Sequence, residues 1–152
     1  MKRDINEVFA LMSKFYEENM PFNRLLGFKI EEMSLERVAV TMGMKEDLIG
    51  NPGLKILHGG AISAILDFTG GVAAQVHVVK SMLDVPEDEL VKKLIGMGTI
   101  DLRIDYIRPG RGELFRATGE ILRLGKKVAV TRSKLHNDKG KLIAAGTSSY
   151  IL

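Results

Sequence analysis

The 152-residue sequence contains no cysteine, which excludes several classes of protein and of catalytic site. Without cysteine, the chain has no disulfide framework, no thiol nucleophile, and no zinc or iron–sulfur site with cysteine ligands. It has only three histidines, His58, His77 and His136, and no metal-ligand spacing links them. The glycine-rich segments carry neither the lysine signature of a phosphate-binding loop nor a dinucleotide-binding fingerprint. The sequence therefore indicates neither a metal nor a nucleotide-cofactor site.

Segments that would direct the chain to a membrane are also missing. Residues 1–7 are mostly charged or polar and lack the apolar stretch of a signal peptide. The most apolar window, Leu57 to Val79, is long enough to span a bilayer, but it contains His58, Asp67, Gln75 and His77. We therefore predict a buried core helix in a cytoplasmic protein.

The composition is that of a folded globular protein. Hydrophobic residues make up 45% of the sequence and charged residues 27%, which is too apolar for a disordered chain. We find no repeat, linker or low-complexity segment, and the length suits one core. Residues 1–152 are therefore expected to form a single domain.

The charges are unevenly distributed along the chain. Residues 1–100 contain 11 Lys and Arg against 14 Asp and Glu, whereas residues 101–152 contain 11 against 5, so the two parts carry net charges of −3 and +6. Such asymmetry indicates either an anionic partner or a solvated sheet face rich in Lys and Arg. Nucleic acid is the less favoured partner, because no aromatic residues are interleaved with the basic ones.

Hydrophobic periodicity predicts the order of helices and strands. The expected elements are a helix from Asp4 to near Pro21, strands over 28–34 and 36–44, a helix over 58–79, a short acidic helix or loop over 84–94, and strands over 97–106, 114–122, 128–136 and 142–151. Within residues 97–106, Ile100 and Tyr106 belong to an apolar face and Thr99 to the opposite, polar face.

This order has one economical arrangement. Short hairpin connections favour an antiparallel sheet, and a helix that is apolar on nearly every side must be covered on nearly every side. The sequence therefore predicts an α+β hotdog fold, in which a curved antiparallel sheet of about six strands wraps one long central helix, with an additional N-terminal helix.

Asp67 is the residue that this pattern does not explain. It stands inside the apolar run from Ala61 to Phe68, where an unpaired carboxylate would be costly to bury. It is either a paired or solvent-facing side chain or a catalytic carboxylate in a cleft, and the second reading is favoured.

The start of the same helix is the second candidate position. The segment His58-Gly59-Gly60 leaves backbone N–H groups unshielded at the positive end of the helix dipole, which suits an oxyanion or a polarised carbonyl. A tight turn with a capping histidine is the alternative. Nine residues separate His58 from Asp67, so along a helix they lie roughly 13 Å apart. If both groups serve one reaction, two chains must contribute them, which predicts an obligate dimer.

These residues resemble a known family. Leu57-His58-Gly59-Gly60-Ala61 with Asp67 is similar to the hotdog-fold acyl-CoA thioesterases of the PaaI-like type. The segment Gly98 to Tyr106, followed by Arg108 to Gly112, resembles that family's third strand and turn. Three further segments resemble the bacterial branch described as medium- and long-chain acyl-CoA thioesterases: Met20 to Arg24, Lys127 to Val130, and Leu135 to Asn137.

The resemblance implies a role for each matching residue. Asp67 would activate water as a general base or attack the thioester directly, and Gly59 or Gly60 would supply a backbone N–H to the thioester oxygen. His58 would help to place that end of the site. Asn51 would contact the carbonyl, and Thr99 would orient the water. The segment Arg108-Pro109-Gly110-Arg111 would lie near the pantetheine and nucleotide of coenzyme A.

The implied partners follow from this chemistry. The substrate would be a hydrophobic acyl-CoA, hydrolysed without a metal or cofactor, with no nucleic acid or membrane as partner. The protein would be a dimer with shared active sites, or a tetramer of such dimers. Two alternatives stay open: a non-catalytic acyl-CoA-binding or sensor domain, and a hotdog hydratase or dehydratase.

Overall fold

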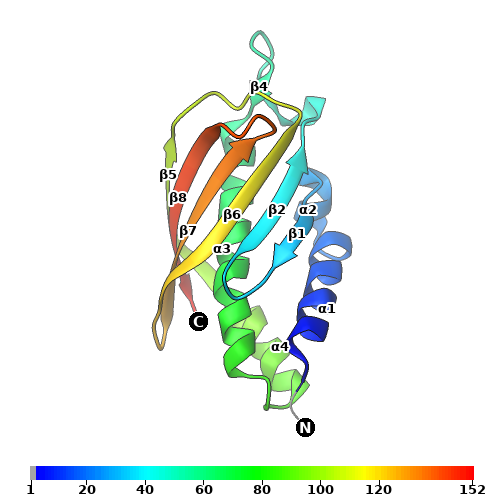
Figure 1. Ribbon diagram of the computed structural model, residues 1–152, viewed down its shortest axis with the longest axis vertical. Helices are drawn as coiled ribbons and strands as arrows, with labels where there is room; N and C mark the ends of the chain where they lie inside the picture. Colours follow the sequence, from blue (N-terminus) through cyan, green and yellow to red (C-terminus); the bar gives the residue numbers. More distant parts are fainter. Residues whose placement is uncertain (1–2) are drawn as a thin grey trace.

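A six-stranded antiparallel sheet and the long helix packed against it form the core of the structure (Figure 1). The computed structural model describes residues 3–152. The helices are α1 (Ile5–Glu18), α2 (Pro21–Leu26), α3 (Gly59–Ser81) and α4 (Glu87–Gly96). The strands are β1 (Lys29–Met33), β2 (Val38–Gly43), β3 (Ile49–Asn51), β4 (Ile56–Leu57), β5 (Gly98–Tyr106), β6 (Leu114–Leu124), β7 (Val128–Asn137) and β8 (Leu142–Ile151). The order in the main sheet is β1-β2-β6-β7-β8-β5.

The predicted hotdog fold is confirmed, with two local differences. The expected single N-terminal helix ends at Glu18, and Pro21 begins the separate helix α2, because proline is well suited to the first turn of a helix. The loop after β2 contains a short 3-10 helix (Glu46–Leu48) and the small hairpin β3–β4, which were not predicted. The β3–β4 hairpin leads into the start of α3 and α2 follows α1 directly, so the central arrangement of sheet and helix is unchanged.

Helix α3 is the core helix that the apolar window predicts. It is long and apolar enough to span a bilayer, but 61% of its most apolar window is buried inside the protein. Its closest contacts are with β6, β7 and β8, and Ile65 and Leu66 are completely buried there. The sheet therefore supplies the apolar environment that α3 requires.

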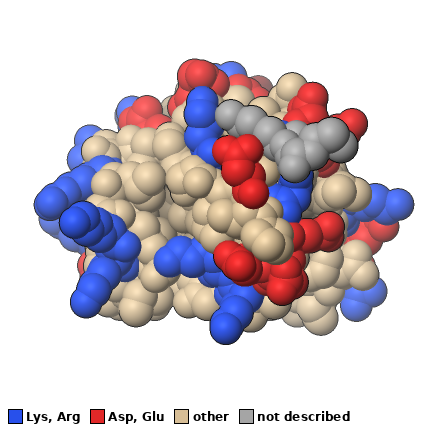
Figure 2. Space-filling model, turned by 90° about the horizontal axis from the view of Figure 1, so that it is seen from below, with Lys and Arg blue, Asp and Glu red and all other residues tan. Residues whose placement is uncertain are grey.

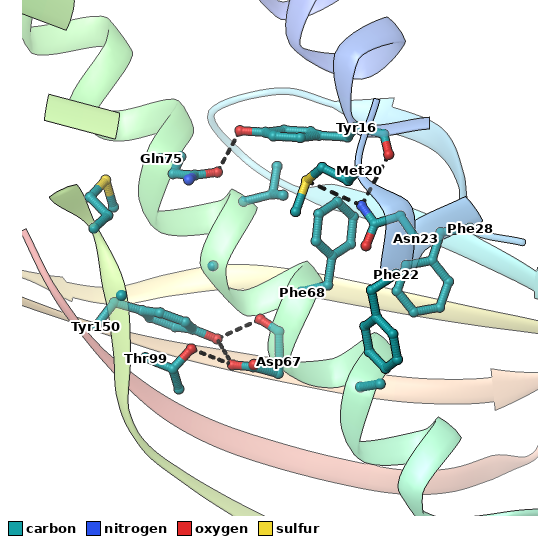
Figure 3. Close-up of a pocket in the computed structure, with 15 residues that line it drawn as sticks. Tyr16, Met20, Phe22, Asn23, Phe28, Asp67, Phe68, Gln75, Thr99 and Tyr150 are labelled. Atoms are coloured by element: carbon teal, nitrogen blue, oxygen red, sulfur yellow. Dashed lines mark hydrogen bonds between the residues drawn. The ribbon is translucent and has the colours of Figure 1, made fainter. Parts of the chain in front are cut away.

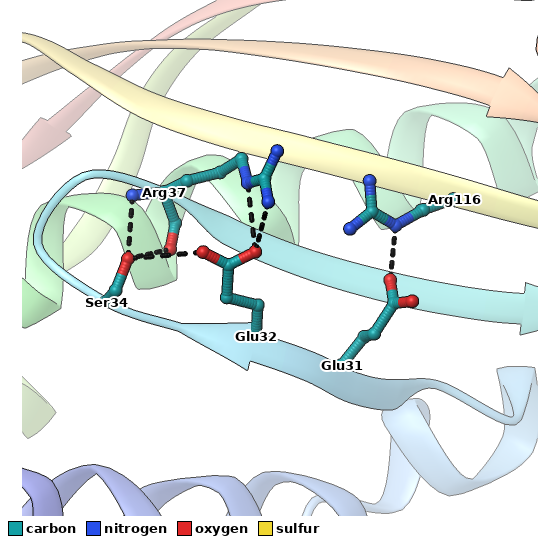
Figure 4. A network of polar contacts seen from close by, with 5 residues as sticks. All are labelled: Glu31, Glu32, Ser34, Arg37 and Arg116. Atoms are coloured by element: carbon teal, nitrogen blue, oxygen red, sulfur yellow. Dashed lines mark hydrogen bonds and ion pairs between the residues drawn. The ribbon is translucent and has the colours of Figure 1, made fainter.

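Charged side chains of the edge strand β1 pair with arginines from neighbouring parts of the sheet (Figure 4). Strand β1 has only five residues and a bulge between Ile30 and Glu32. Glu31 pairs with Arg116 on β6, and Glu32 accepts hydrogen bonds from Arg37, which lower the pKa of the Glu32 carboxyl. A short, bulged and charged edge resists pairing with another strand.

The opposite edge is formed by a longer strand. Strand β5 has nine residues and pairs only with β8, so the backbone groups on its other side have no strand partner within residues 3–152. Ile100 and Tyr106 are 57% and 56% exposed on this strand. A long edge with exposed apolar side chains is a surface on which another strand can pair.

Charged residues of both signs lie at the end of the molecule that contains α4 and the β6–β7 turn. Figure 2 shows a group of Lys and Arg at the left of this view, with Asp and Glu concentrated nearer the centre and right. The acidic first turn of α4 contributes Glu87, Asp88 and Glu89 to this end. The end is therefore not a surface of one sign, and the loop from Arg108 to Arg111 lies at the opposite end (Figure 1).

Candidate active site

Asp67 lies in the middle of α3, and two hydroxyl groups from the sheet hold its carboxylate (Figure 3). The Thr99 hydroxyl donates to Asp67 Oδ1 at 2.9 Å. The Tyr150 hydroxyl lies 2.6 Å from the Asp67 main-chain oxygen and 3.2 Å from Oδ1. Oδ2 has no donor within residues 3–152, so it is the oxygen that remains free to act.

A β-bulge brings Thr99 to this position. The pairing of β5 with β8 shifts between Thr99 and Asp101, which leaves Ile100 as the extra residue. Strict alternation would place Thr99 and Tyr106 on opposite faces, but the extra residue turns Thr99 toward α3 and leaves Ile100 exposed. The prediction of an unbroken alternation through Ile100 is therefore wrong.

Tyr150 was not predicted as a site residue. It pairs with Thr99 across the β5–β8 ladder, so both side chains point toward α3. Burial raises the pKa of its phenol, which therefore stays protonated and can donate to Asp67. A Cβ at Gly70 would lie 2.7 Å from the Tyr150 hydroxyl oxygen, so glycine is required there for this approach. No motif marks Tyr150, because an aromatic residue in a strand usually belongs to the core.

The start of α3 is more constrained than expected. His58 is the N-cap, and its Nδ1 accepts a hydrogen bond of 2.7 Å from the Gly60 N–H. The expectation of two unshielded N–H groups therefore does not hold at Gly60. The Gly59 N–H has no acceptor in the described part of the chain, and the Tyr106 hydroxyl donates to the Gly59 carbonyl at 3.2 Å. Gly59 thus presents the available donor.

Asn51 lies at the end of β3, and its side chain stabilises a local turn. Asn51 Oδ1 accepts from the Leu54 N–H at 3.2 Å, and its main-chain oxygen accepts from Leu54 and Lys55. Gly50, the preceding residue, packs against His58, since a Cβ there would lie 2.8 Å from the His58 Cα. The structure therefore brings the Asn51 segment to the start of α3, but no hydrogen bond within residues 3–152 joins Asn51 to Asp67.

A cavity of about 260 Å³ opens beside Asp67. Asp67, Thr99 and Tyr150 lie at one end of it, and Tyr16 and Gln75 lie at the other (Figure 3). The rest of the lining is mainly apolar, with Asn23 as its one polar side chain, and consists of Met20, Phe22, Asn23, Phe28, Ala64, Phe68, Gly71, Val72, Met97 and Gly98. The carboxylate therefore faces a space that suits a hydrophobic chain.

A second, basic cavity of about 240 Å³ lies at the β5–β6 loop. Its cationic lining consists of Arg108, Arg111, Lys139 and Lys141. Each arginine also donates to a main-chain oxygen, Arg108 to Leu142 at 2.9 Å and Arg111 to Leu54 at 3.1 Å. Of the other two predicted residues, Pro109 also lines the cavity, whereas Gly110 is buried in close contact with Leu57. The lysines were not predicted as site residues.

Comparison with known proteins identifies the family. Residues 54–144 match the thioesterase superfamily model, and this range contains both the His58-Gly59-Gly60 segment and Asp67. The chain belongs to the thioesterase superfamily. It is 40% identical to the medium/long-chain acyl-CoA thioesterase YigI of Escherichia coli over 96% of this chain and 94% of the relative. The YigI protein of Salmonella typhimurium is 39% identical over the same shares. The predicted family and enzyme class, a thioester hydrolase, are thereby confirmed.

Solved structures of thioesterase-superfamily proteins agree with the fold. A Shewanella oneidensis protein related to the superfamily is 40% identical, with a TM-score of 0.93 and coverage of 99% of both chains. The Escherichia coli PaaI protein from the phenylacetic acid degradation operon is 20% identical, with a TM-score of 0.73 over 96% of this chain and 90% of PaaI. At that identity the likeness to PaaI concerns the fold alone.

The two donors to Asp67 lead to a testable prediction for this thioesterase-superfamily site. Tyr150→Phe removes the phenol that reaches Asp67 but keeps the buried ring, so we expect kcat for thioester hydrolysis to fall about 10- to 100-fold, about 1.4–2.7 kcal/mol of barrier, with KM nearly unchanged. The matched control is Ser149→Ala, the adjacent residue on β8, which faces the other side of the sheet. A kcat for Tyr150→Phe within about twofold of wild type would show that the phenol does not position Asp67.

Proposed function

We propose that the protein hydrolyses medium- and long-chain acyl-CoA to the free acid and coenzyme A, as a single hotdog domain in the cytoplasm. The observation that carries this proposal is the carboxylate of Asp67, fixed through Oδ1 by Thr99 and Tyr150, with Oδ2 free at the end of an apolar cavity. The 40% identity to an acyl-CoA thioesterase over nearly the whole chain supports the same substrate class. We expect neither nucleic acid nor membrane as a partner.

The free oxygen of Asp67 can open the thioester in two ways. As a general base, Oδ2 takes a proton from water while the water oxygen bonds to the carbonyl carbon; the C–S bond then breaks, and the coenzyme A thiolate takes up a proton. As a nucleophile, Oδ2 itself bonds to the carbonyl carbon and expels the thiolate, and water then hydrolyses the anhydride. In either case Thr99 and Tyr150 hold the carboxylate in orientation.

The start of α3 is the proposed oxyanion site. The Gly59 N–H lies at the positive end of a 23-residue helix and needs no rearrangement to donate to a thioester oxygen. The Gly60 N–H becomes a second donor only when the His58 ring moves away, because it already donates a hydrogen bond to His58 Nδ1 in the helix cap. His58 therefore contributes by fixing the geometry of the helix start. We propose that Asn51, on the adjacent segment, contacts the same carbonyl.

One chain does not place these groups together. Eight residues separate Gly59 from Asp67, so along the axis of α3 they lie about 12 Å apart. A two-fold pairing of β5 with the β5 strand of a second copy would solve this, because antiparallel pairing centred near Leu102 sets the start of one strand beside the end of the other. Thr99 contacts Asp67 and Tyr106 contacts Gly59, so such a dimer brings each Asp67 to the other chain's helix start.

The exposed edge of β5 supports this dimer, since β5 has nine residues and pairs only with β8, whereas the edge strand β1 has only five residues. The prediction of an obligate dimer with shared sites is thus retained as part of the proposal, and two dimers can pair into a tetramer through other surfaces.

The basic cavity is the proposed site for the phosphates of coenzyme A. Arg108 and Pro109 line both this cavity and a neighbouring groove that includes Gly59 and Tyr106. A pantetheine arm in that groove would lead from a carbonyl at Gly59 to phosphates beside Arg108, Arg111, Lys139 and Lys141. Gly110 supports this site indirectly, through its contact with Leu57.

The central test of the function is Asp67→Asn. The substitution keeps the shape of the side chain but removes the base or nucleophile, so we expect release of free coenzyme A from saturated acyl-CoAs to fall at least about 100-fold. Folding and dimerisation should be unchanged. If the wild type releases no coenzyme A at any acyl length, the protein is a binding domain or a hydratase. If Asp67→Asn keeps more than about a tenth of the wild-type rate, the substitution raises the barrier by less than about 1.4 kcal/mol, and Asp67 is not the reacting group.

Subunit mixing tests the shared site. Asp67→Asn and His58→Ala chains are each expected to be nearly inactive, but a mixed dimer contains one site built from two unmodified residues. Random exchange should restore about a quarter of the wild-type activity, because half the dimers are mixed and each has one intact site. Absence of rescue after exchange has been verified by mass spectrometry of the dimers would contradict a site built from two chains.

The basic cavity is tested by removing its arginines. In Arg108→Ala and Arg111→Ala, we expect KM for acyl-CoA to rise roughly tenfold with little change in kcat, because the lost contacts bind the substrate equally before and in the transition state. With an acyl-pantetheine substrate, which lacks the nucleotide, the variants should equal the wild type. Arg132→Ala, an exposed residue of β7, is the control. An equal loss with both substrates would place the arginines away from the phosphates.

A further inference from the structure

Two polar side chains, Tyr16 and Gln75, line the end of the apolar cavity that lies away from Asp67. The Tyr16 hydroxyl donates to Gln75 Oε1 at 2.6 Å, and this hydrogen bond joins α1 to α3 across the cavity (Figure 3). Nothing in the thioester chemistry uses either group. A polar bridge in the lining of a mainly apolar cavity therefore needs another explanation.

Tyr16 is held firmly in this position. Its side chain is only 8% exposed, and its ring packs edge-on against Phe68 with the centroids 5.4 Å apart. Phe68 in turn stacks on Phe28, with a centroid distance of 5.5 Å. These three rings form one continuous wall, so Tyr16 has little freedom to move away from Gln75 without disturbing the wall.

The bridge lies at a fixed distance from the reacting carboxylate. Asp67, Gly71 and Gln75 follow one another at intervals of four residues, and all three line the cavity. The eight residues from Asp67 to Gln75 correspond to about 12 Å along the axis of α3. Gly71, between them, has no side chain to obstruct a chain that lies along the helix.

This distance corresponds to a definite acyl length. With C–C bonds of about 1.5 Å, an extended alkyl chain advances about 1.25 Å per carbon, so about nine or ten carbons fit between Asp67 and the bridge. A longer chain must turn aside or separate Tyr16 from Gln75. Separation would leave a phenol and an amide without hydrogen-bond partners in a largely buried place, which is unfavourable.

We propose that the Tyr16–Gln75 bridge is the length stop of the acyl site. Chains of up to about ten carbons gain affinity with each added methylene, and longer chains gain nothing further from the cavity. The proposal rests on the proposed function only in assuming that the acyl group lies in this cavity with its carbonyl beside Asp67.

The experiment measures binding and turnover over a series of saturated acyl-CoAs of even length, from about six to about sixteen carbons. Dissociation constants are measured by calorimetry on Asp67→Asn protein, so hydrolysis does not interfere, and kcat/KM is measured on protein with Asp67 intact. Each measurement is repeated with Gln75→Ala, which removes the α3 side of the bridge, and separately with Tyr16→Leu, which removes the α1 side. Gln75→Ala is the safer variant for folding, because Gln75 is only partly buried and alanine favours helix.

The expected result is a shift toward longer chains in both variants. In proteins with Tyr16 and Gln75 intact, the affinity for acyl-CoA should stop rising at about ten carbons, and in the variants it should rise for about two to four carbons more. The ratio of kcat/KM for an acyl-CoA of about fourteen carbons to that for one of about eight carbons should increase at least about tenfold in the variants. The control is Leu11→Ala, on the same helix as Tyr16 but 70% exposed and away from the cavity. It should leave the length profile unchanged.

The outcomes separate this proposal from the proposed function. Coenzyme A release with one length profile in wild type and both variants overturns the length stop and leaves the thioesterase function standing. A break in affinity near ten carbons that moves in the variants, without release of coenzyme A, supports the stop and overturns the hydrolytic function. Absence of acyl-CoA binding at every length overturns both.

Discussion

The carboxylate of Asp67 on a helix covered by the sheet is the constraint on which the rest of the site depends. A charged group in such a place must have hydrogen-bond donors. Thr99 and Tyr150 supply them from neighbouring strands, and each donor requires an exception to regular structure nearby. The bulge at Ile100 turns Thr99 toward the helix, and Gly70 leaves room for the Tyr150 hydroxyl. These irregularities therefore have one common cause.

The same carboxylate links the site to the free edge of the sheet. Its donor Thr99 stands near the start of β5, whereas Tyr106, at the end of that strand, contacts Gly59. The two ends of this edge strand contact the two halves of the proposed site. Antiparallel pairing with the same strand of a second copy can therefore complete the site. In the proposed dimer, strand β5 forms the interface between the two chains. The same strand also brings the proposed general base of one chain to the proposed oxyanion donor of the other.

Periodicity was enough to predict the order of the longer elements and the central helix, because α3 and the long strands have strong apolar patterns. Asp67 was found because it interrupts such a pattern. The bulge at Ile100 was not predictable, since the sequence alternates without a break there and only the pairing with β8 reveals the extra residue. Tyr150 was missed because its chemistry depends on which residue faces it across the ladder. The hydrogen bond at the His58 cap could not be predicted from the sequence either. His58 Nδ1 decides whether the Gly60 N–H is available as a donor to substrate.

The site divides its tasks between two sides of α3. The donors to Asp67 come from β5 and β8, whereas the Tyr16–Gln75 bridge joins α3 to α1. Gln75 belongs to the same helix as Asp67 but lies two turns away and shares none of its hydrogen-bond partners. Substitutions more than about 7–10 Å apart that share no partners usually act independently. In the proposed enzyme, the preferred acyl length can therefore change through α1 and the C-terminal half of α3 without altering the proposed reacting carboxylate.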